Sequence, residues 1–214
     1  MEVRPDGSTG KSLQITKETY IGSGDADLSY PGDALLAARH ASLGIREAKL
    51  LLKDLGSPNG TFLKQRQDSE LTPGDIFLLG RTLFRFTTQS LDESAQAQAA
   101  AQRTVVLMGP PKLQKGPLTA KLEQVQLNGD VVQEFKLEKP EITLGRVNAD
   151  LVFNNDPYMS GSHARIVAQP GRFRLQDLKS RNGIYRRIRA EIELRDGDEF
   201  FLGEQLFRAE IKTS

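Results

Sequence analysis

The feature that most constrains the fold of this chain is an internal repeat. When the sequence is compared with itself at an offset of 123 residues, no gap is needed between Gly22 and Phe84. The matching positions are turn glycines, apolar residues and the two histidines. They include the pairs Gly22 and Gly145, His40 and His163, Asn59 and Asn182, Gly74 and Gly197, Gly80 and Gly203, and Phe84 and Phe207. This ungapped match predicts one fold that occurs twice.

The length of 214 residues agrees with two domains of ordinary size. We place the first domain at residues 1–89 and the second at 118–214. The segment 90–117 between them is rich in Ala and Gln and then in Pro and Gly, and it lacks the apolar pattern of the repeats. It is therefore predicted to be a linker, partly helical and partly extended.

Within each repeat the apolar segments are short and are separated by turn residues. In the second repeat, the segments 118–125 and 131–137 flank the dipeptide Asn128-Gly129, which favours a tight hairpin. Several further short segments of this kind follow. Many short strands at close spacing predict an all-β chain with a β-sandwich in each half.

Composition excludes several classes of function. Lys and Arg total 29 against 28 Asp and Glu, so the chain has no overall field to attract nucleic acid or an anionic membrane. It has no Cys and only two His, which leaves no cysteine nucleophile and no evident metal set. No cofactor is expected. Without a signal-like segment or a long apolar run, a soluble cytoplasmic protein is expected.

Four features of the second repeat form a recognisable set. They are Gly145-Arg146, Ser160 with His163, the tetrapeptide Ser180-Arg181-Asn182-Gly183, and Gly197-Asp198. At these spacings the chain resembles the forkhead-associated (FHA) domain family over most of both repeats. The resemblance implies a β-sandwich of about eleven strands per repeat. It also implies that loops at one end of the sandwich bind phosphothreonine peptides.

The residues of this set suit the recognition of a phosphate dianion. Arg146 offers a guanidinium fork that can contact two phosphate oxygens, and Ser160 offers a hydroxyl donor. The resemblance implies further phosphate contacts at Gly161 and Arg181. It also implies that Asn182 holds the peptide backbone beside the phosphothreonine.

Other residues are expected to support the site. By the resemblance, His163 braces the binding loops, and we assign the same supporting role to Gly145 and Gly183. Arg186 and Arg187 form a basic cluster close to the predicted site in sequence. A role in peptide specificity, with a preference for an acidic residue, and a role as solvated loop residues are equally open for them.

The first repeat has lost the phosphate-binding residues. Ser23 stands at the position of Arg146 and Ala37 at that of Ser160, whereas His40 and the segment Ser57-Pro58-Asn59-Gly60 are retained. Without the guanidinium and the hydroxyl, most charge-assisted bonding to phosphate is lost. The first repeat is therefore expected to make phospho-independent contacts.

These inferences predict a non-catalytic signalling adaptor that binds threonine-phosphorylated protein through its second repeat, with a functional link to a Ser/Thr kinase. One alternative is a tandem that binds unmodified protein through both repeats. A less favoured alternative is nucleic-acid binding through the arginines around residues 181–189. Once phosphorylated, Thr104 in the linker could bind in cis to the site of the second repeat and compete with other ligands, although a β-rich segment packed on a domain edge is the simpler interpretation.

Overall fold

The computed structural model describes residues 1–3, 8–89 and 119–212, and these form 19 strands and no helix. The all-β prediction is confirmed, whereas the expected linker and Thr104 lie outside the described residues. In the first repeat the strands are β1 (Glu2–Val3), β2 (Thr19–Gly22), β3 (Leu28–Ser29), β4 (Ala41–Arg46), β5 (Lys49–Asp54), β6 (Thr61–Lys64), β7 (Ser69–Leu71), β8 (Ile76–Leu79) and β9 (Thr82–Gln89). In the second repeat they are β10 (Thr119–Val125), β11 (Val131–Lys136), β12 (Glu141–Gly145), β13 (Leu151–Val152), β14 (Ala164–Gln169), β15 (Arg172–Asp177), β16 (Ile184–Arg187), β17 (Ile192–Leu194), β18 (Glu199–Leu202) and β19 (Gln205–Arg208).

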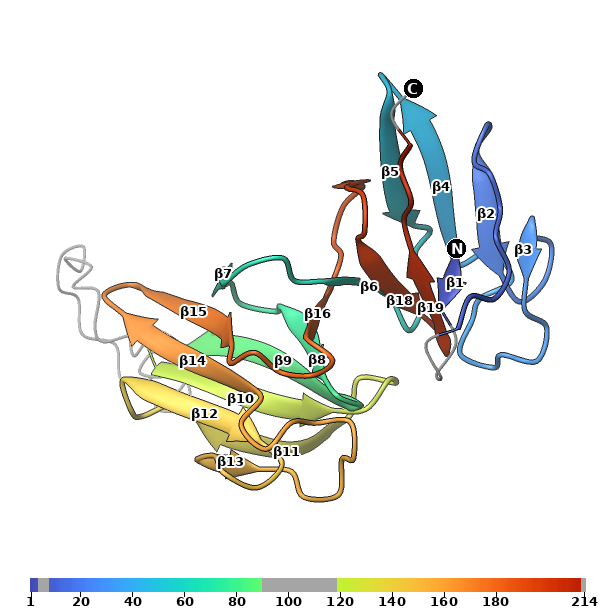
Figure 1. Ribbon diagram of the computed structural model, residues 1–214. Coiled ribbons are helices and arrows are strands. Elements are labelled where there is room, and N and C mark those ends of the chain that lie inside the picture. Colours follow the sequence, from blue (N-terminus) through green and yellow to red (C-terminus); the bar gives the residue numbers. More distant parts are fainter. Residues whose placement is uncertain (4–7, 90–118, 213–214) are drawn as a thin grey trace, which may run out of the picture.

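The strands form one long sheet and two shorter ones. The long sheet has nine strands in the order β1-β19-β18-β6-β16-β8-β9-β10-β11. The five-stranded sheets have the orders β17-β5-β4-β2-β3 and β13-β12-β14-β15-β7. Each five-stranded sheet shares a core with one half of the long sheet, so the molecule consists of two joined sandwiches (Figure 1).

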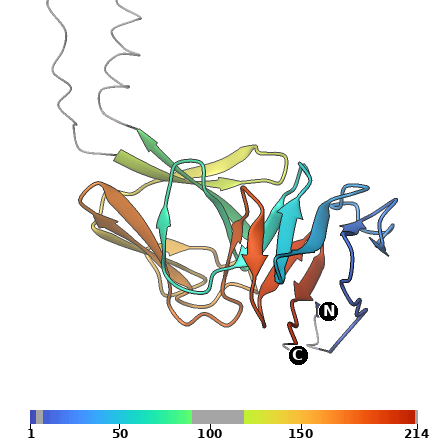
Figure 2. The ribbon, with the colours of Figure 1, turned by 90° about the horizontal axis from the view of Figure 1, so that it is seen from above.

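The two repeats exchange their last strands. β7 of the first repeat pairs with β15 of the second, and residues 83–89 of β9 pair with the whole of β10 (Figure 2). Reciprocally, β17 of the second repeat pairs with β5, and β18 pairs with β6. We call residues 1–64 with 188–212 the first unit, and residues 65–89 with 119–187 the second unit. Each unit is therefore built from both repeats.

The exchange has an internal two-fold relation. At the crossing point, β6 and β16 pair antiparallel, and Leu63 lies opposite Arg186, its own counterpart at the offset of 123. The peptide N–H of Gln65 donates to the carbonyl of Ile184 at 2.7 Å, and that of Ile188 donates to the carbonyl of Thr61 at 2.9 Å. These two hydrogen bonds join equivalent positions in opposite directions, as a two-fold axis through the β6–β16 pair requires.

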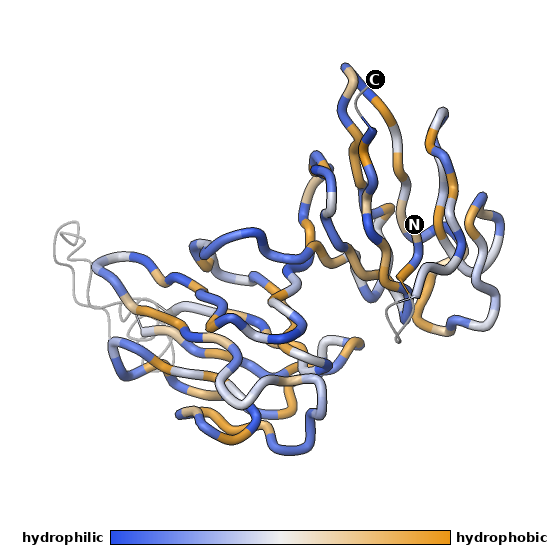
Figure 3. Tube along the Cα trace, in the orientation of Figure 1, coloured by the Kyte–Doolittle hydropathy of each residue, from blue (hydrophilic) through white to orange (hydrophobic). Residues whose placement is uncertain are grey.

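Buried side chains show how much each unit depends on the exchanged strands. The core of the second unit includes Leu71, Phe77, Leu79, Phe84 and Phe86 of the first repeat. At about 2 kcal/mol for each buried side chain, they contribute about 10 kcal/mol, which is comparable to the net stability of a whole domain. Hydrophobic stretches occur along the chain in both units (Figure 3). The second unit therefore depends on residues from the first repeat.

The first unit depends on the second repeat in the same way. Its core combines first-repeat residues such as Ile21 and Leu52 with Leu194, Phe200 and Phe207 of the second repeat. The expected boundaries at 1–89 and 118–214 stay a prediction about the sequence repeats. The strands of the folded molecule do not group by these boundaries, because each unit contains strands of both repeats. Equivalent strands of two similar repeats have the same apolar pattern, so either can pair with the same partner strand.

Ion pairs across the exchange repeat the two-fold relation. Arg66 of the first repeat contacts the buried carboxylate of Asp198, and Arg189 of the second repeat contacts that of Asp75 at 3.2 Å. Arg66 is equivalent to Arg189, and Asp75 is equivalent to Asp198. Burial alone raises the pKa of Asp198, but hydrogen bonds from Arg66 and from the backbone of Arg195 outweigh it and lower that pKa. Both carboxylates thus join the two repeats.

Among the described residues, no helix is long and apolar enough to cross a membrane.

The exchange predicts which engineered cysteines will form a disulfide. Glu70 of β7 lies opposite Arg174 of β15, whereas Glu193, the counterpart of Glu70, lies opposite Leu51. Directly opposite residues in an antiparallel pair have Cα atoms about 4.5–5.5 Å apart, within disulfide range. Glu70→Cys with Arg174→Cys should therefore oxidise quantitatively in the monomeric chain, as measured by free-thiol titration and by mass spectrometry of linked peptides.

The matched control is Glu70→Cys with Leu51→Cys, which joins the positions that would face each other if each repeat kept its own strands. This control should retain free thiols, and the natural chain contributes none because it has no Cys. Cross-linking of the control pair in place of the first pair would show that the repeats do not exchange strands.

Candidate functional site

The second unit brings three loops of the second repeat together. They are residues 146–150 between β12 and β13, 153–163 between β13 and β14, and 178–183 between β15 and β16. The peptide N–H of Arg146 donates to the carbonyl of Ser160 at 2.8 Å, and that of Val147 donates to the carbonyl of Gly161 at 3.2 Å. A Cβ on Gly145 would lie 2.1 Å from the carbonyl oxygen of Gly161, so the close approach of the first two loops requires glycine there.

The predicted phosphate-binding residues lie at the meeting point of these loops. The Ser160 hydroxyl accepts a hydrogen bond from the peptide N–H of Arg181 at 3.0 Å, which leaves its own hydrogen free to donate. Arg146 and Arg181 are exposed, and their guanidinium groups make no hydrogen bond or ion pair with any described residue. The structure thus brings two unpaired cations and a hydroxyl donor to one end of the sandwich.

His163 links the second loop to the third. It is fully buried, its Nδ1 accepts from the peptide N–H of Ser160 at 3.0 Å, and its Nε2 lies 3.0 Å from the carbonyl of Gly183. An imidazole that accepts at Nδ1 and faces a carbonyl at Nε2 must be neutral with its proton on Nε2. This geometry agrees with the bracing role expected for His163, Gly145 and Gly183.

Asn182 is positioned by a residue that the sequence pattern did not single out. Its side-chain amide donates to the carbonyl of Tyr158 at 2.7 Å. Tyr158 is exposed at the surface, with 46% of its area accessible. Its position two residues before Ser160 was visible in the sequence, but nothing in the motif distinguished it from other loop residues. The binding roles of the predicted site residues stay predictions.

Arg186 and Arg187 face residues of the first repeat. Arg186 donates to the Ser69 hydroxyl at 2.6 Å and pairs with Asp75. Arg187 donates to the carbonyl of Ser57 at 3.2 Å, in the loop of the first repeat that corresponds to residues 180–183. Their proposed role in specificity stays a prediction, but both guanidinium groups are already engaged at the crossing of the repeats.

Comparisons with known proteins agree with these loops and strands. A family model described as the FHA domain matches residues 19–80 and 142–203, which together make up more than half of the chain. The chain belongs to the FHA domain family. The two matches begin and end at the offset of 123 residues, so the family resemblance expected from the sequence is confirmed for both repeats.

One solved structure found in the comparison is EmbR of Mycobacterium tuberculosis in complex with a low-affinity phosphopeptide. It shares 22% identity over 57% of this chain, with a TM-score of 0.29. The aligned region makes up only 30% of the EmbR chain. Among curated proteins, none matches this chain significantly.

The first FHA repeat keeps the loop scaffold without the side chains that are predicted to bind phosphate in the second. The Asn59 amide donates to the carbonyl of Leu35 at 2.7 Å, and His40 spans from the N–H of Ala37 to the carbonyl of Gly60. The Ser23 hydroxyl donates to the carbonyl of Leu36 at 2.9 Å and is therefore turned into the loop. The two FHA repeats thus share one backbone arrangement and differ in what they offer to a ligand.

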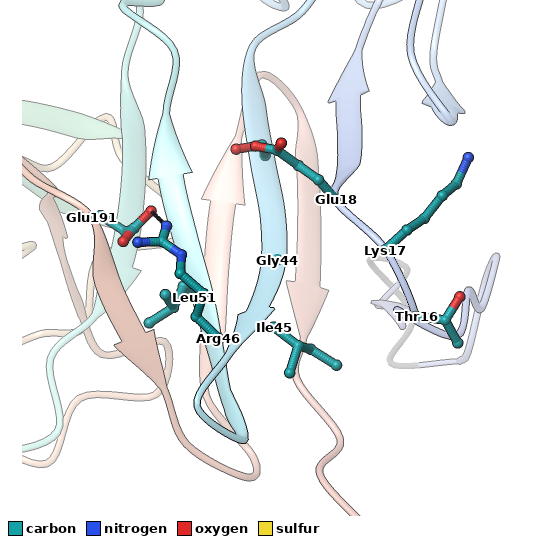
Figure 4. Close-up of a pocket in the computed structure, with 9 residues that line it drawn as sticks. Thr16, Lys17, Glu18, Gly44, Ile45, Arg46, Leu51 and Glu191 are labelled. Carbon is teal, nitrogen blue, oxygen red and sulfur yellow. Dashed lines mark hydrogen bonds and ion pairs between the residues drawn. The ribbon is translucent and has the colours of Figure 1, made fainter.

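Away from these loops, the described residues contain no cluster of acidic residues and histidines suited to a metal ion. A shallow pocket of about 240 Å³ lies beside β4 and β5 of the first unit (Figure 4). Glu191 of the second FHA repeat reaches into this region and pairs with Arg46 of the first at 2.5 Å. This pocket therefore lies at a contact between the two repeats.

The two buried histidines predict a loss of stability in mild acid. Burial lowers the pKa of His40 and His163 below the usual 6.5, against the opposing effect of the carbonyls of Gly60 and Gly183. An unfolded chain takes up protons near pH 6.5, whereas the folded chain takes them up only at lower pH. The stability that comes from neutral histidine is therefore present above pH 6.5 and lost as the pH falls below it. Denaturant unfolding between pH 7 and pH 5 measures this loss.

We expect both histidines to contribute to this decrease, because each has a lowered pKa in the folded chain. The variant His163→Asn should be less stable at pH 7 but should lose about half as much on acidification. An unchanged pH dependence in this variant would show that His163 does not contribute to the effect.

Proposed function

We propose that the chain is a phosphothreonine-dependent protein-interaction module in which the second FHA repeat reads the phosphate. The observation that carries the proposal is that Arg146 and Arg181, two exposed arginines with unpaired guanidinium groups, both donate a backbone hydrogen bond to Ser160, whose own hydroxyl hydrogen is free to donate. A phosphate dianion is held by this combination of fixed cations and neutral donors. Membership of the FHA family supports the same assignment.

Asn182 provides the peptide side of the site, and Gly161 offers a further contact to the phosphate. The Asn182 amide is oriented by its bond to the carbonyl of Tyr158, so its remaining polar groups are held in place for a peptide backbone. The peptide N–H of Gly161 has no acceptor among the described residues and lies next to Ser160. The proposed ligand is therefore a threonine-phosphorylated segment of a partner protein, which makes the chain a signalling adaptor linked to a Ser/Thr kinase.

We propose no catalytic activity. His40 and His163 are buried and bonded to backbone groups, and the chain has no Cys. Nucleic-acid binding is not favoured, because Arg186 and Arg189 are paired with Asp75 and do not form a free basic surface. A cytoplasmic location agrees with this role.

The variant Arg146→Ala tests phosphate reading by the second repeat. Because the loops depend on strands of both repeats, the full chain is the appropriate protein. Losing a two-pronged charged contact costs about 2–4 kcal/mol, or roughly 30- to 1,000-fold in affinity. Calorimetric titration with a phosphothreonine peptide measures the change.

Arg172→Ala is the matched control, since Arg172 is another exposed arginine of the second unit and its side chain has no partner among the described residues. It should bind the peptide as the parent does. Equal affinity of Arg146→Ala and the parent for the phosphopeptide would show that Arg146 does not contact the phosphate.

The first FHA repeat is proposed to make phospho-independent contacts. In a chain that carries Arg146→Ala, Ser160→Ala and Arg181→Ala, a threonine peptide and its phosphorylated form should bind with affinities within about twofold of each other, because Ser23 and Ala37 offer no charged donor. Fluorescence polarisation with both peptides makes the comparison. A strong phosphate preference that persists in this triple variant would place a second phosphate site in the first repeat.

A further inference from the structure

The hairpin tip between β8 and β9 brings a cation of the first repeat to the site of the second. The guanidinium carbon of Arg81 lies 4.5 Å from the centre of the Tyr158 ring. Tyr158 is the residue whose carbonyl orients Asn182. Arg81 thus contacts the residue that orients Asn182, the side chain proposed to hold the peptide backbone.

This hairpin tip is firmly docked into the loop that carries Ser160. The peptide N–H of Arg81 and the hydroxyl of Thr82 donate to Asp156 Oδ2 at 2.7 and 2.8 Å. Gly80 has a left-handed backbone, and a Cβ there would lie 2.7 Å from the amide nitrogen of Met159. The position of Arg81 is therefore set by the backbone, and a change of its side chain leaves these contacts in place.

The strand exchange decides which charge stands at this position. In the first unit, the equivalent tip comes from the second repeat, where the peptide N–H of Glu204 donates to Asp33 Oδ2 at 2.7 Å. Glu204 is the counterpart of Arg81, and Asp33 is the counterpart of Asp156. If each repeat kept its own strands, the carboxylate of Glu204 would stand beside the phosphate-binding loops.

Arg81 is also available to a ligand. It is exposed, and its guanidinium makes no ion pair with any described residue. Arg186 and Arg187, by contrast, bond to first-repeat groups at the crossing. An exposed cation beside an aromatic ring is suited to a carboxylate of a bound peptide.

We propose that Arg81 of the first repeat completes the phosphopeptide site of the second repeat and favours ligands with an acidic residue flanking the phosphothreonine. This inference rests on the proposed function of the second repeat. It makes the site composite, because the phosphate-binding residues and the specificity residue come from different repeats.

The test uses two phosphothreonine peptides that differ only at the flanking positions, which are Asp in one and Asn in the other. The full-length parent should prefer the Asp peptide, and Arg81→Glu should reverse this preference. We expect Arg81→Glu to weaken binding of the Asp peptide by roughly three- to tenfold, the combined effect of an exposed ion pair lost and a like charge introduced. Arg81→Gln, which removes the charge but keeps the length, should abolish the preference without reversing it.

Glu204→Arg is the matched control, since it changes the equivalent hairpin tip in the first unit. It should leave both affinities unchanged. If Glu204→Arg instead strengthened binding of the Asp peptide while Arg81→Glu had no effect, the site would not be composite and the inference would be wrong. Equal binding of both peptides by the parent would likewise overturn it. Failure of the parent to bind the Asn peptide more tightly than its unphosphorylated form would count against the proposed function itself.

Discussion

The antiparallel pairing of β6 with β16 is the contact on which the rest of the molecule depends. It places Leu63 opposite Arg186, its own counterpart, and so relates the two repeats by a two-fold axis. Beyond this pair each repeat continues into the other's sandwich. Because each core then contains buried residues of both repeats, neither unit can form from one repeat alone in this arrangement. We expect the two units to fold as one cooperative system.

The loops at the two sites illustrate how scaffold and chemistry are separated. In both repeats a buried histidine bridges two loops through backbone groups, and an asparagine amide is tied to a loop carbonyl. These bonds do not involve the groups proposed to hold phosphate. The scaffold can therefore persist while Ser23 and Ala37 replace the charged fork and the hydroxyl. Together with Pro58 at the position of Arg181, these changes divide the proposed labour between the repeats.

Strand exchange also changes the electrostatics of each site without changing its backbone. Both hairpin tips dock on an aspartate in the same way, but one presents Arg81 and the other Glu204. Because the two units are related by a two-fold axis, strand exchange places the Arg81 tip in the second unit and the Glu204 tip in the first. The sequence pattern pointed to Arg186 and Arg187 as the basic residues near the site, whereas the crossing of the repeats engages both of them and brings Arg81 to the loops instead.

The family and the all-β class could be predicted from the sequence, because turn glycines, alternating apolar residues and the pattern around Arg146 and Ser160 are local features. The structure brings the loops that carry these residues together at one end of the second unit, and their binding roles stay predictions. The identity of the repeat that supplies the last strands of each sandwich could be read only from the tertiary structure. Two repeats with equivalent apolar patterns can pair within themselves or with each other, and no local signal distinguishes these outcomes. The contribution of Arg81 to the second site depends on that choice, so it could not be predicted from the sequence.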